Sequence, residues 1–389
     1  MPRTLYTEEH EDFRAAAREF VERSLKPRVE EMISLKSIPR DIWLEAGKQG
    51  FFGLDIPEEF GGAGAEDYRF NAVLAEEWAH FNAATAACFG IHADVCPPYI
   101  VDLGTQEQKE RWLPGMASGE LICAIGMTEP SGGSDLAALK TTAVRADDGS
   151  GDWILNGSKT FITNGYQCDL VIVAARTDAS KGPKGITLFM VERSMAGFVN
   201  GRKLDKVGQD ESDTAELFFE NVRVPDANRL GAEGLGFIAM MQRLPQERIG
   251  AACSNIAHAK QIFVETLAYA KERKAFGQPI GDFQAIQFKL ADMATQIEAA
   301  RQLIHHAASL KDAGQPCLTQ AAMAKLFASE MAERVCSDAI QIHGGYGYVS
   351  DFPVERIYRD VRVCQIYEGT SDIQKILIGR GLASGTYDS

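Results

Sequence analysis

The hydrophobic period of this sequence changes twice along the chain, and that change constrains the fold more than any other feature. Apolar residues recur at helical spacing over residues 8–120, as they do from Phe13 to Leu25. From about residue 121 the apolar segments become short and rich in β-branched or aromatic residues, with Gly, Asn and Asp between them, which is typical of strands. The helical period returns from residue 234. Because the strands do not alternate with helices, a doubly wound nucleotide-binding fold is disfavoured.

This order predicts an α+β chain with three domains. We expect an N-terminal helical domain over residues 1–120, a middle β domain over residues 121–230 and a C-terminal helical domain over residues 231–389. In the last of these, apolar residues from Phe283 to Ile304 follow a three-to-four spacing, which predicts a long helix packed in a bundle.

Prolines and capping residues indicate where the N-terminal helices begin and end. We expect Pro27 to end the first helix and Pro39 to open a second one from its first turn. Thr105 and Gln108 have the spacing of a capping box, which predicts a helix start at that point.

Similar local signals occur later in the chain. The pairs Asn156–Gly157 and Asn164–Gly165 predict hairpin turns between strands. Ser371 and Gln374 have capping-box spacing and predict the start of a last helix.

The charge balance excludes several classes of partner. There are 40 Lys and Arg residues against 54 Asp and Glu residues, so the formal net charge is 40 − 54 = −14. With no long basic run, this charge makes nucleic acid or an anionic membrane surface an unfavourable partner. No apolar run approaches the ~20 residues that span a bilayer. The polar, acidic N-terminus resembles neither a signal peptide nor a transit peptide.

The eight cysteines and seven histidines do not form metal or disulfide patterns. No C-x-x-C is present, and cysteines such as Cys123 and Cys364 lie in apolar runs. In a chain of this size they indicate buried free thiols in a reducing compartment, so we expect a cytoplasmic protein. The adjacent His305 and His306 do not share a helix face, so we expect no metal site.

Three polar segments are candidates for ligand binding, and each also has a plain structural interpretation. TEPSGGSD (128–135) could cradle a phosphate with its N–H groups and hydroxyls, or it is a surface turn; it lacks the GK[ST] of a P-loop. KERKAFG (271–277) offers a phosphate contact beside an aromatic ring, or basic residues suited to a helix C-terminus. IHGGYGYVSDFP (342–353) is a Gly-rich ligand loop or a helix-ending turn.

Three single residues are equally ambiguous when they are taken alone. Glu368, in YEGTSDIQ, is interpreted as a helix cap, and Glu247 beside Arg248, in RLPQERIG, as half of an exposed ion pair near a helix start. His343 is interpreted as a satisfied residue at a helix end.

Taken together and in this order, the segments AIGMTEPSGGSD, NGSKTFITNG, ERKAFG, QIHGGYGY and QIYEGTSDIQKILIGR resemble the acyl-CoA dehydrogenase family. The resemblance covers residues 5–382. It implies an N-terminal helical domain, a middle β-barrel-like domain and a C-terminal four-helix bundle. It also implies FAD as cofactor, α,β-dehydrogenation of an acyl thioester to the trans-enoyl thioester, and electron-transfer flavoprotein as electron acceptor. Family members are usually homotetramers built as dimers of dimers.

The resemblance also assigns site residues, position by position. The flavin would be contacted by Met127, Thr128, Phe161, Thr163, Thr370 and Asp372, the last standing where Gln or Glu is common. The FAD of a neighbouring subunit would be reached by Arg273, Phe276 and Gln284, with Gln341 and Gly345 on its adenosine and diphosphate side. The substrate would meet Ser134, Arg248, Tyr367 and Gly369, and Ser134 would also contact the cofactor.

Two glutamates compete for the role of base that removes the α-proton. Most family members place the base at the position of Glu368, whose backbone N–H also donates to the thioester oxygen, whereas isovaleryl-type and long-chain-type members place it at that of Glu247. We expect Glu368 to be the base and Glu247 to be the alternative. Two carboxylates in one dry site repel each other, so one of them should be largely protonated. Desolvation raises the pKa of Glu368 by more than the nearby helix N-terminus lowers it, so we expect a raised pKa for Glu368.

The sequence leaves rival functions open. One is an oxygen-using flavoprotein oxidase on the same fold, and another is a non-catalytic protein that binds acyl thioesters. The acyl carrier could be CoA or an acyl carrier protein, since both present the same phosphopantetheine arm. Pro245 stands where many members have an Asp that holds the CoA adenine, so that contact is not expected here.

Overall fold

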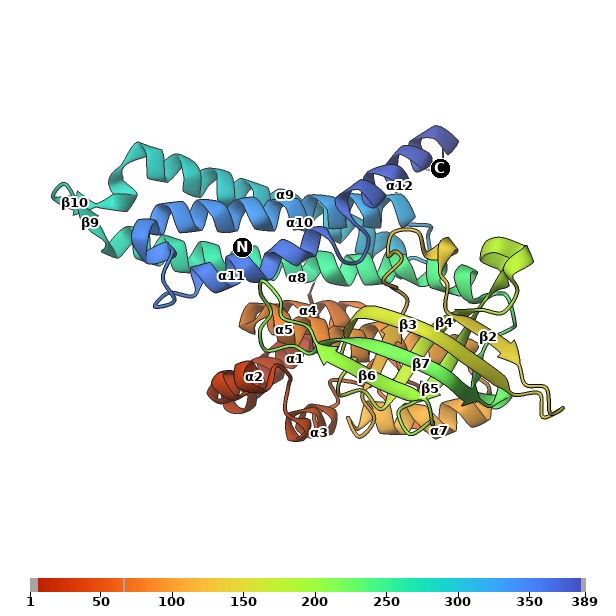
Figure 1. The fold of residues 1–389 in the computed structure, drawn as a ribbon. Coiled ribbons are helices and arrows are strands. Elements are labelled where there is room, and N and C mark those ends of the chain that lie inside the picture. The colour runs from red at the N-terminus through yellow and green to blue at the C-terminus, as the bar shows by residue number, and fades with distance from the viewer. Residues whose placement is uncertain (1–5, 66, 386–389) are drawn as a thin grey trace.

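The computed structural model describes residues 6–65 and 67–385, and it confirms the α+β order (Figure 1). Helices occupy the chain up to Ala117, strands occupy Cys123 to Leu230, and long helices follow from Gly236. The helices are α1 Glu8–Phe20, α2 Val29–Leu35, α3 Arg40–Lys48, α4 Arg69–Phe81, α5 Ala83–Gly90, α6 Cys96–Leu103, α7 Gln106–Ala117, α8 Gly236–Glu272, α9 Gln284–Asp312, α10 Leu318–His343, α11 Val354–Val361 and α12 Ser371–Ser384.

The strands form one eight-stranded sheet and a small hairpin. The order in the sheet is β6-β7-β3-β2-β4-β5-β8, and β1 pairs with β4 in parallel. Sequence patterns identified the segments of β1 to β5 and β7 but missed β6, β8 and the hairpin strands β9 and β10. The strands are β1 Cys123–Gly126, β2 Thr142–Arg145, β3 Trp153–Thr163, β4 Leu170–Arg176, β5 Ile186–Glu192, β6 Phe198–Lys203, β7 Thr214–Val224, β8 Arg229–Leu230, and the hairpin strands β9 Lys274–Ala275 and β10 Gln278–Pro279.

The prediction of a hairpin turn at Asn156–Gly157 is wrong, because both residues lie inside β3. The pairing of β3 with β7 shifts register between Leu155 and Gly157, so the pair forms a bulge. Gly157 has φ 149°, and a Cβ there would lie 2.5 Å from the Thr141 hydroxyl oxygen. The glycine is therefore required by the close approach of Thr141.

Asn164–Gly165 does form a turn, but not a hairpin. It ends β3, yet the next strand, β4, pairs with β1, β2 and β5. Asn164 has φ 63°, and its side chain donates to the Cys88 carbonyl at 2.8 Å, which ties the turn to α5.

Helix ends agree with most, but not all, of the predictions. The Thr105–Gln108 capping box is confirmed at the start of α7. After Phe20 the chain makes a π-helical turn and then a 3₁₀ turn containing Pro27, so the first helix ends near the expected place. Pro39 is the N-cap of α3 and does not lie in its first turn.

The predicted cap of the last helix is wrong by one residue. Thr370, not Ser371, is the N-cap of α12, and its hydroxyl accepts from the Ile373 N–H. The side chain of Gln374 does not cap the helix. It donates instead to the carbonyls of Glu368 and Gly369, both at 2.9 Å.

The long helices α8, α9 and α10 lie side by side, and α11 and α12 pack against α10 to complete the bundle (Figure 1). The predicted helix from Phe283 to Ile304 is confirmed as α9, with Phe283 as its N-cap. The buried face of α10 is rich in alanine, which lets neighbouring backbones approach closely. One residue on this face is a lysine, Lys325, which is fully buried.

Two further apolar cores join the N-terminal helices to the two faces of the sheet. In one, Phe20, Phe51 and Trp78 pack edge to face and continue into the inner sheet residues. In the other, Tyr99 and Trp112 cover the opposite face. All eight cysteines are free and buried in such cores, as the sequence predicted.

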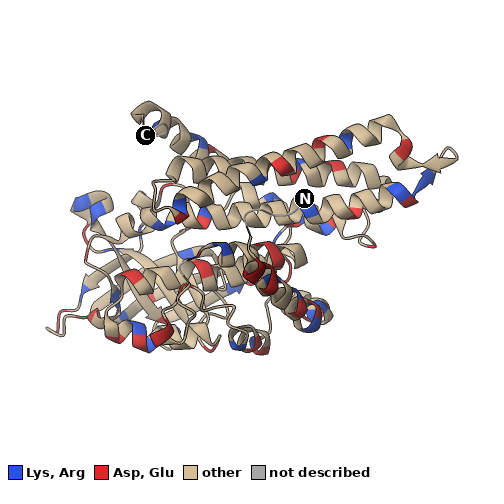
Figure 2. Ribbon diagram, turned by 180° about the vertical axis from the view of Figure 1, so that it is seen from behind, with Lys and Arg blue, Asp and Glu red and all other residues tan. Residues whose placement is uncertain are grey.

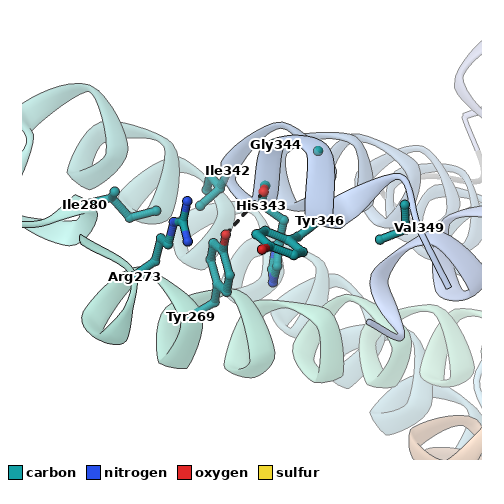
Figure 3. Close-up of a pocket in the computed structure, with 9 residues that line it drawn as sticks. Tyr269, Arg273, Ile280, Ile342, His343, Gly344, Tyr346 and Val349 are labelled. Atoms are coloured by element: carbon teal, nitrogen blue, oxygen red, sulfur yellow. Dashed lines mark hydrogen bonds between the residues drawn. The ribbon is translucent and has the colours of Figure 1, made fainter. Parts of the chain in front are cut away.

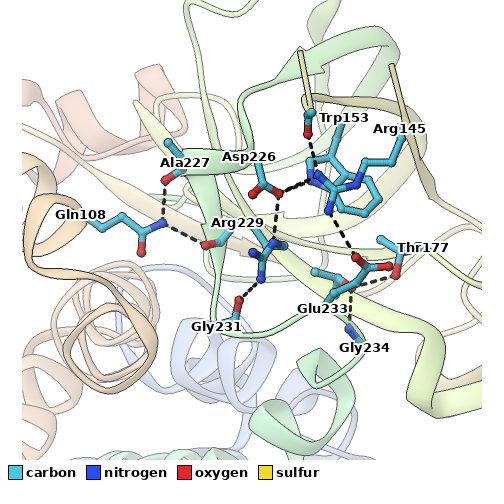
Figure 4. Close-up of polar contacts among 12 residues, drawn as sticks. Gln108, Arg145, Trp153, Thr177, Asp226, Ala227, Arg229, Gly231, Glu233 and Gly234 are labelled. Atoms are coloured by element: carbon cyan, nitrogen blue, oxygen red, sulfur yellow. Dashed lines mark hydrogen bonds and ion pairs between the residues drawn. The ribbon is translucent and has the colours of Figure 1, made fainter. Parts of the chain in front are cut away.

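Polar contacts fix the sheet against both helical parts (Figure 4). Gln108 of α7 donates to the carbonyls of Ala227 and Arg229, at 2.6 and 2.9 Å. Asp226 accepts from Trp153 at 2.8 Å and pairs with Arg145 and Arg229. These contacts hold the segment that leads from the sheet into α8. The predicted domain limits at 120/121 and 230/231 stay proposals, supported by the change from helix to strand and back.

Among the described residues, no helix is long and apolar enough to cross a membrane. Within residues 6–65 and 67–385, no group of three or more His, Cys, Asp and Glu side chains is arranged to hold a metal ion.

Candidate active site

The two candidate glutamates lie together. Glu247 belongs to the interior of α8, two residues after Pro245, and is only 7% exposed. Glu368 lies in the turn before α12, and its carboxyl group is hydrogen-bonded to that of Glu247. The interpretation of Glu247 as half of an exposed ion pair near a helix start is therefore wrong. Sequence spacing could not reveal that burial, because α8 is covered by α4 and α10 only in the folded chain.

A hydrogen bond between two carboxyl groups requires that they share one proton. Burial raises the pKa of Glu247 well above its usual range, and the charge of Glu368 raises it further. Burial also raises the pKa of Glu368, while the hydrogen bond from Glu247 and the charges of Lys325 and Arg248 act in the opposite direction. Burial and mutual repulsion therefore favour a pair that carries one proton and one negative charge.

Lys325 and Gln374 fix the loop that carries Glu368. The Lys325 Nζ donates to the Gly369 carbonyl at 2.7 Å, where Gln374 also donates. Glu368 has φ 54° and Gly369 has φ 86°, so two successive residues take the left-handed conformation. Two donors on Gly369 and one on Glu368 hold this unfavourable backbone in place.

Sequence analysis missed Lys325, although a signal was present. It is a lone lysine on the alanine-rich face of a helix, where Ala321, Ala324 and Ala328 are buried. Burial lowers the pKa of Lys325 to about 8.

Tyr99 and Arg248 complete the surroundings of the glutamate pair. The Tyr99 hydroxyl donates to Glu247 Oε1 at 3.3 Å, a contact for which the sequence offered no signal. Arg248 is 3% exposed, and its Nε and Nη1 are buried without a hydrogen-bond partner in the described structure. Because unpaired buried donors are costly, Arg248 indicates a place for a polar ligand group.

The candidate residues of the sheet form a second group, around β1 and β3. Phe161 is 67% exposed and has φ 60°, so a large ring stands on the sheet surface at a strained backbone position. Met127 and Thr128 directly follow β1, Thr163 is the last residue of β3, and all three are partly buried. Ser134 is exposed in the loop that follows β1.

A buried ion pair holds this loop in shape. Lys159 Nζ lies 2.8 Å from Glu129 Oε1 and also donates to the Met127 carbonyl. The carboxylate of Glu129 accepts from the N–H groups of Lys140 and Thr141, at 2.6 and 2.9 Å. These bonds fix the start of TEPSGGSD, so this segment is a loop held by buried hydrogen bonds and not only a surface turn.

The third group lies at the hairpin end of the bundle, where Figure 2 shows basic residues. A cavity of about 430 Å³ opens there, lined by Arg273, Tyr346 and Gly345 among others (Figure 3). A Cβ built on Gly344 or Gly345 would meet no atom within 4 Å, so the glycine turn leaves open space. The candidates Gln284 and Gln341 are exposed, and Phe276 is 97% exposed on the β9–β10 hairpin.

His343 lies at the wall of this cavity and has a structural role. Its Nδ1 lies 2.8 Å from the Ala339 carbonyl, and its ring stacks on Tyr269 with 4.2 Å between centroids. The interpretation of His343 as a satisfied residue at a helix end is confirmed.

The structure brings together only some of the predicted site residues. Glu247, Arg248, Tyr367, Glu368, Gly369 and Thr370 meet where α8, α10 and α12 converge. The Arg273 group lies at the other end of α10: Lys325 and His343 are 18 positions apart on that helix, which corresponds to about 27 Å. Asp372 is exposed near Lys375, at 3.9 Å.

Backbone strain also marks the candidate residues. Seven described non-glycine residues have positive φ, and three of them, Phe161, Phe276 and Glu368, are predicted site residues. Such conformations are unfavourable and concentrate at functional positions. The chain thus carries an exposed aromatic ring on its sheet and an acid pair in its helical bundle.

Comparison with known proteins identifies the family. Models of the acyl-CoA dehydrogenase N-terminal, middle and C-terminal domains match residues 7–120, 124–222 and 234–383. The chain belongs to the acyl-CoA dehydrogenase family, whose members are FAD-dependent oxidoreductases, and this confirms the resemblance on which the fold class and enzyme class were predicted.

Individual relatives match over almost the whole chain. The mitochondrial long-chain specific acyl-CoA dehydrogenase of Rattus norvegicus is 43% identical and covers 98% of this chain and 88% of its own length. The acyl-CoA dehydrogenase of Geobacillus kaustophilus superposes with a TM-score of 0.94 at 44% identity, covering 97% and 99% of the two chains. A chain from a structure described as the electron transferring flavoprotein of Acidaminococcus fermentans superposes with a TM-score of 0.92 at 43% identity, covering 98% and 99%.

Proposed function

We propose that this enzyme dehydrogenates an acyl-CoA thioester at its α and β carbons and that Glu368 is the base. The observation that carries this proposal is the hydrogen-bonded pair formed by buried Glu247 and half-buried Glu368. A base must be ionised and poorly hydrated, and Glu368 meets both conditions while Glu247 keeps the proton.

The chain's own groups account for the proton transfer. A C–H beside a thioester carbonyl is a weak acid, so the base must lie close and the developing charge on the oxygen must be stabilised. Glu368 takes the α-proton, and its backbone N–H donates to the thioester oxygen. Protonated Glu247 keeps its hydrogen bond to Glu368 and holds that carboxylate in one orientation. FAD, when bound, supplies the acceptor for the hydride that leaves the β carbon.

The residues of the sheet and the hairpin fit FAD. Exposed Phe161 offers a face to a planar ring. Thr163 lies two positions further along β3, and the Thr128 carbonyl accepts from the Thr160 N–H at 3.0 Å, next to Phe161. Arg273 and the open glycine turn at Gly344 and Gly345 suit the anionic diphosphate.

The wide separation along α10 supports a division of these contacts between two subunits. Met127, Thr128, Ser134, Phe161, Thr163, Thr370 and Asp372 would contact the FAD of their own subunit, and Arg273, Phe276, Gln284, Gln341 and Gly345 that of a neighbour. Exposed Phe276 and Phe288 favour burial in such an interface. We therefore propose a homotetramer built as a dimer of dimers.

The carrier and the electron acceptor complete the proposal. Arg248, with its unpaired buried donors, and Ser134, Tyr367 and Gly369 would contact the thioester and its pantetheine arm, carried by CoA or by an acyl carrier protein. The match to the chain from the electron transferring flavoprotein structure supports a flavoprotein of that kind as electron acceptor.

The test compares Glu368→Gln with Glu247→Gln in single-turnover bleaching of the flavin by an acyl-CoA. Loss of the base should lower the rate by ~10²–10⁴-fold in the first variant. The second should retain substantial activity, because Glu247 acts through Glu368. A large loss only at Glu247 would reverse the assignment.

Two observations on the same preparation distinguish the proposed function from its rivals. Reduced flavin that reoxidises rapidly in air with release of peroxide would identify an oxidase. A protein that stays colourless after FAD is added would identify a binding protein without catalysis.

A further inference from the structure

The part of α8 that carries Glu247 depends on support from outside the helix. Pro245 lies inside α8, two residues before Glu247. Proline has no N–H, so the carbonyl of Met241 lacks its usual partner within the helix, and the helix is weakened at that point. The direction in which Glu247 points is therefore set by the contacts that neighbouring segments make with α8 just after the proline.

Asp94 makes such a contact. It belongs to the π-helical turn Ile91–Val95, and it is partly buried. Its Oδ1 accepts from the side chains of Gln246 and Asn71, both at 2.9 Å. Its Oδ2 accepts from the Tyr68 hydroxyl at 3.1 Å. Three donors directed at the two oxygens favour the carboxylate form of Asp94.

The same carboxylate also meets α8 one turn further on. A Cβ built on Gly250 would lie 3.0 Å from Asp94 Oδ2, so the helix packs directly against this oxygen. Gln246 and Gly250 are four positions apart and lie on one face of α8. Asp94 therefore holds the helix at two points, one before and one after Glu247 in the sequence.

A second bond from the same part of the chain fixes the rotation of α8. The π-helical turn leads directly into α6, where the Tyr99 hydroxyl donates to Glu247 Oε1 at 3.3 Å. Successive helix residues point about 100° apart. Bonds from one segment to both Gln246 and Glu247 therefore prevent α8 from turning about its axis, a motion that would carry the Glu247 carboxyl group away from Glu368.

We propose that Asp94 is a positioning residue for the dehydrogenation and holds α8 in the rotation that directs Glu247 to Glu368. The inference rests on the proposed function, since it concerns the acid pair of that reaction. Asp94 acts through Gln246 and Glu247 and does not itself contact the reacting carbons. Its charge has a separate effect, because it raises the pKa of both glutamates.

Other titratable or charged groups face these carboxyl groups. Those around Asp94 are Asp55, Tyr68, Cys253 and Lys311. Those around the glutamate pair are Cys96, Tyr99, Arg243, Arg248, Lys325 and Tyr367. Variants at Asp94 leave all of them in place, so a shift of the pH profile reports the charge of Asp94.

The experiment compares Asp94→Asn with Asp94→Ala in single-turnover flavin bleaching of the FAD-loaded enzyme by an acyl-CoA, between pH 6 and about 9. Asparagine can still accept from Gln246 and can donate to the Tyr68 hydroxyl, which is also an acceptor. Asp94→Asn should therefore keep the limiting rate within about threefold, while the rise of the rate with pH moves to lower pH. Asp94→Ala should show the same shift and lose about tenfold in limiting rate, with little change in the acyl-CoA concentration that gives half of it.

Gly250→Ala tests the same contact from α8. Its new methyl group displaces the Asp94 carboxylate, so the limiting rate should fall about threefold to tenfold. The matched control is Gly379→Ala, at an exposed glycine of α12 where a Cβ meets no atom within 4 Å. It should match wild type in rate and in pH profile.

Equal rate losses in Asp94→Asn and Asp94→Ala, with the pH profile of wild type, would indicate a merely structural role and overturn the inference. Wild-type behaviour of both variants would overturn it too, and the dehydrogenase function would stand in either case. Absence of bleaching of the wild-type flavin with every acyl-CoA overturns both. If Asp94→Ala fails to fold, the pH profile of Asp94→Asn and the rate of Gly250→Ala decide the question.

Discussion

Replacement of Lys325 by methionine tests whether this buried ammonium holds the reactive loop. The change keeps the length of the side chain but removes the bond of 2.7 Å to the Gly369 carbonyl and the positive charge that acts on Glu368. A hydrogen bond to a charged group contributes about 1.5–3 kcal/mol. If that amount is lost in the transition state, the single-turnover rate falls about tenfold to hundredfold.

The pH dependence of the rate should change as well. The charge of Lys325 favours the ionised form of Glu368, so its removal raises the pKa of Glu368 further. The rise of the bleaching rate with pH should therefore move to higher pH in Lys325→Met. Stopped-flow measurements of flavin bleaching between pH 6 and about 9 would detect this shift.

Stability should respond in a different way from the rate. Burial lowers the pKa of Lys325 to about 8 from 10.5, so the charged form is disfavoured by roughly 3 kcal/mol in the folded chain. Since the unfolded chain binds the proton more tightly, wild-type stability gains this amount as pH rises from about 8 to 10.5. Lys325→Met should lack that gain in urea unfolding, and Gly369 keeps its bond to Gln374.

Lys375→Met on α12 is the matched control, because that lysine is mostly exposed and only weakly paired with Glu330 and Asp372. It should match wild type in rate and in pH profile. If Lys325→Met bleaches the flavin at the wild-type rate with an unmoved pH profile, the positioning role of Lys325 is wrong.

Four other variants test three separate parts of the structure. Lys159→Met leaves Glu129 buried without its ammonium and should cost about 3–5 kcal/mol in the free energy of unfolding, measured in urea; a cost below about 1 kcal/mol would contradict the role of the pair. In Glu129→Gln the free energy of unfolding should depend less on pH in the acid range. The pKa of Glu129 is lowered to about 2, so the wild-type chain has this stabilisation above pH 4.5 and loses it as pH falls toward 2. Gly157→Ala should destabilise the sheet by about 2 kcal/mol through the clash with Thr141, whereas Gly90→Ala, in open space on a helix, should be neutral or stabilising by up to about 1 kcal/mol in thermal unfolding. Arg273→Ala should weaken FAD retention on gel filtration about tenfold without changing thermal stability. The control is Arg202→Ala, at an exposed arginine of β6, which should leave FAD retention intact. Equal retention in both variants would refute a diphosphate contact.

Local signals predicted the elements better than the contacts between them. The Thr105–Gln108 box depends only on residues of one helix turn, and it was confirmed. Asn156–Gly157 has the composition of a hairpin turn, but β3 continues through it because pairing with β2 and β7 stabilises the strand on both sides. Tertiary pairing thus overrode turn propensity.

The candidate site divides in the same way. Motifs pointed to Glu247 and Glu368, but their roles stay proposals, and neither motif shows which carboxyl group holds the proton. That depends on the burial of Glu247 in α8 and on Lys325, which stands 43 positions before Glu368 and was missed.

The order of amino acids alone determined where the chain is helical or extended, because periodicity and capping act within a few residues. It also determined the family, because several motifs recur in a set order. Only the tertiary structure decided that two glutamates 121 positions apart lie together and that Lys325 holds the loop that carries one of them. The physical reason is that solvation and Coulomb energies depend on distances and burial, and those exist only once remote segments have packed together.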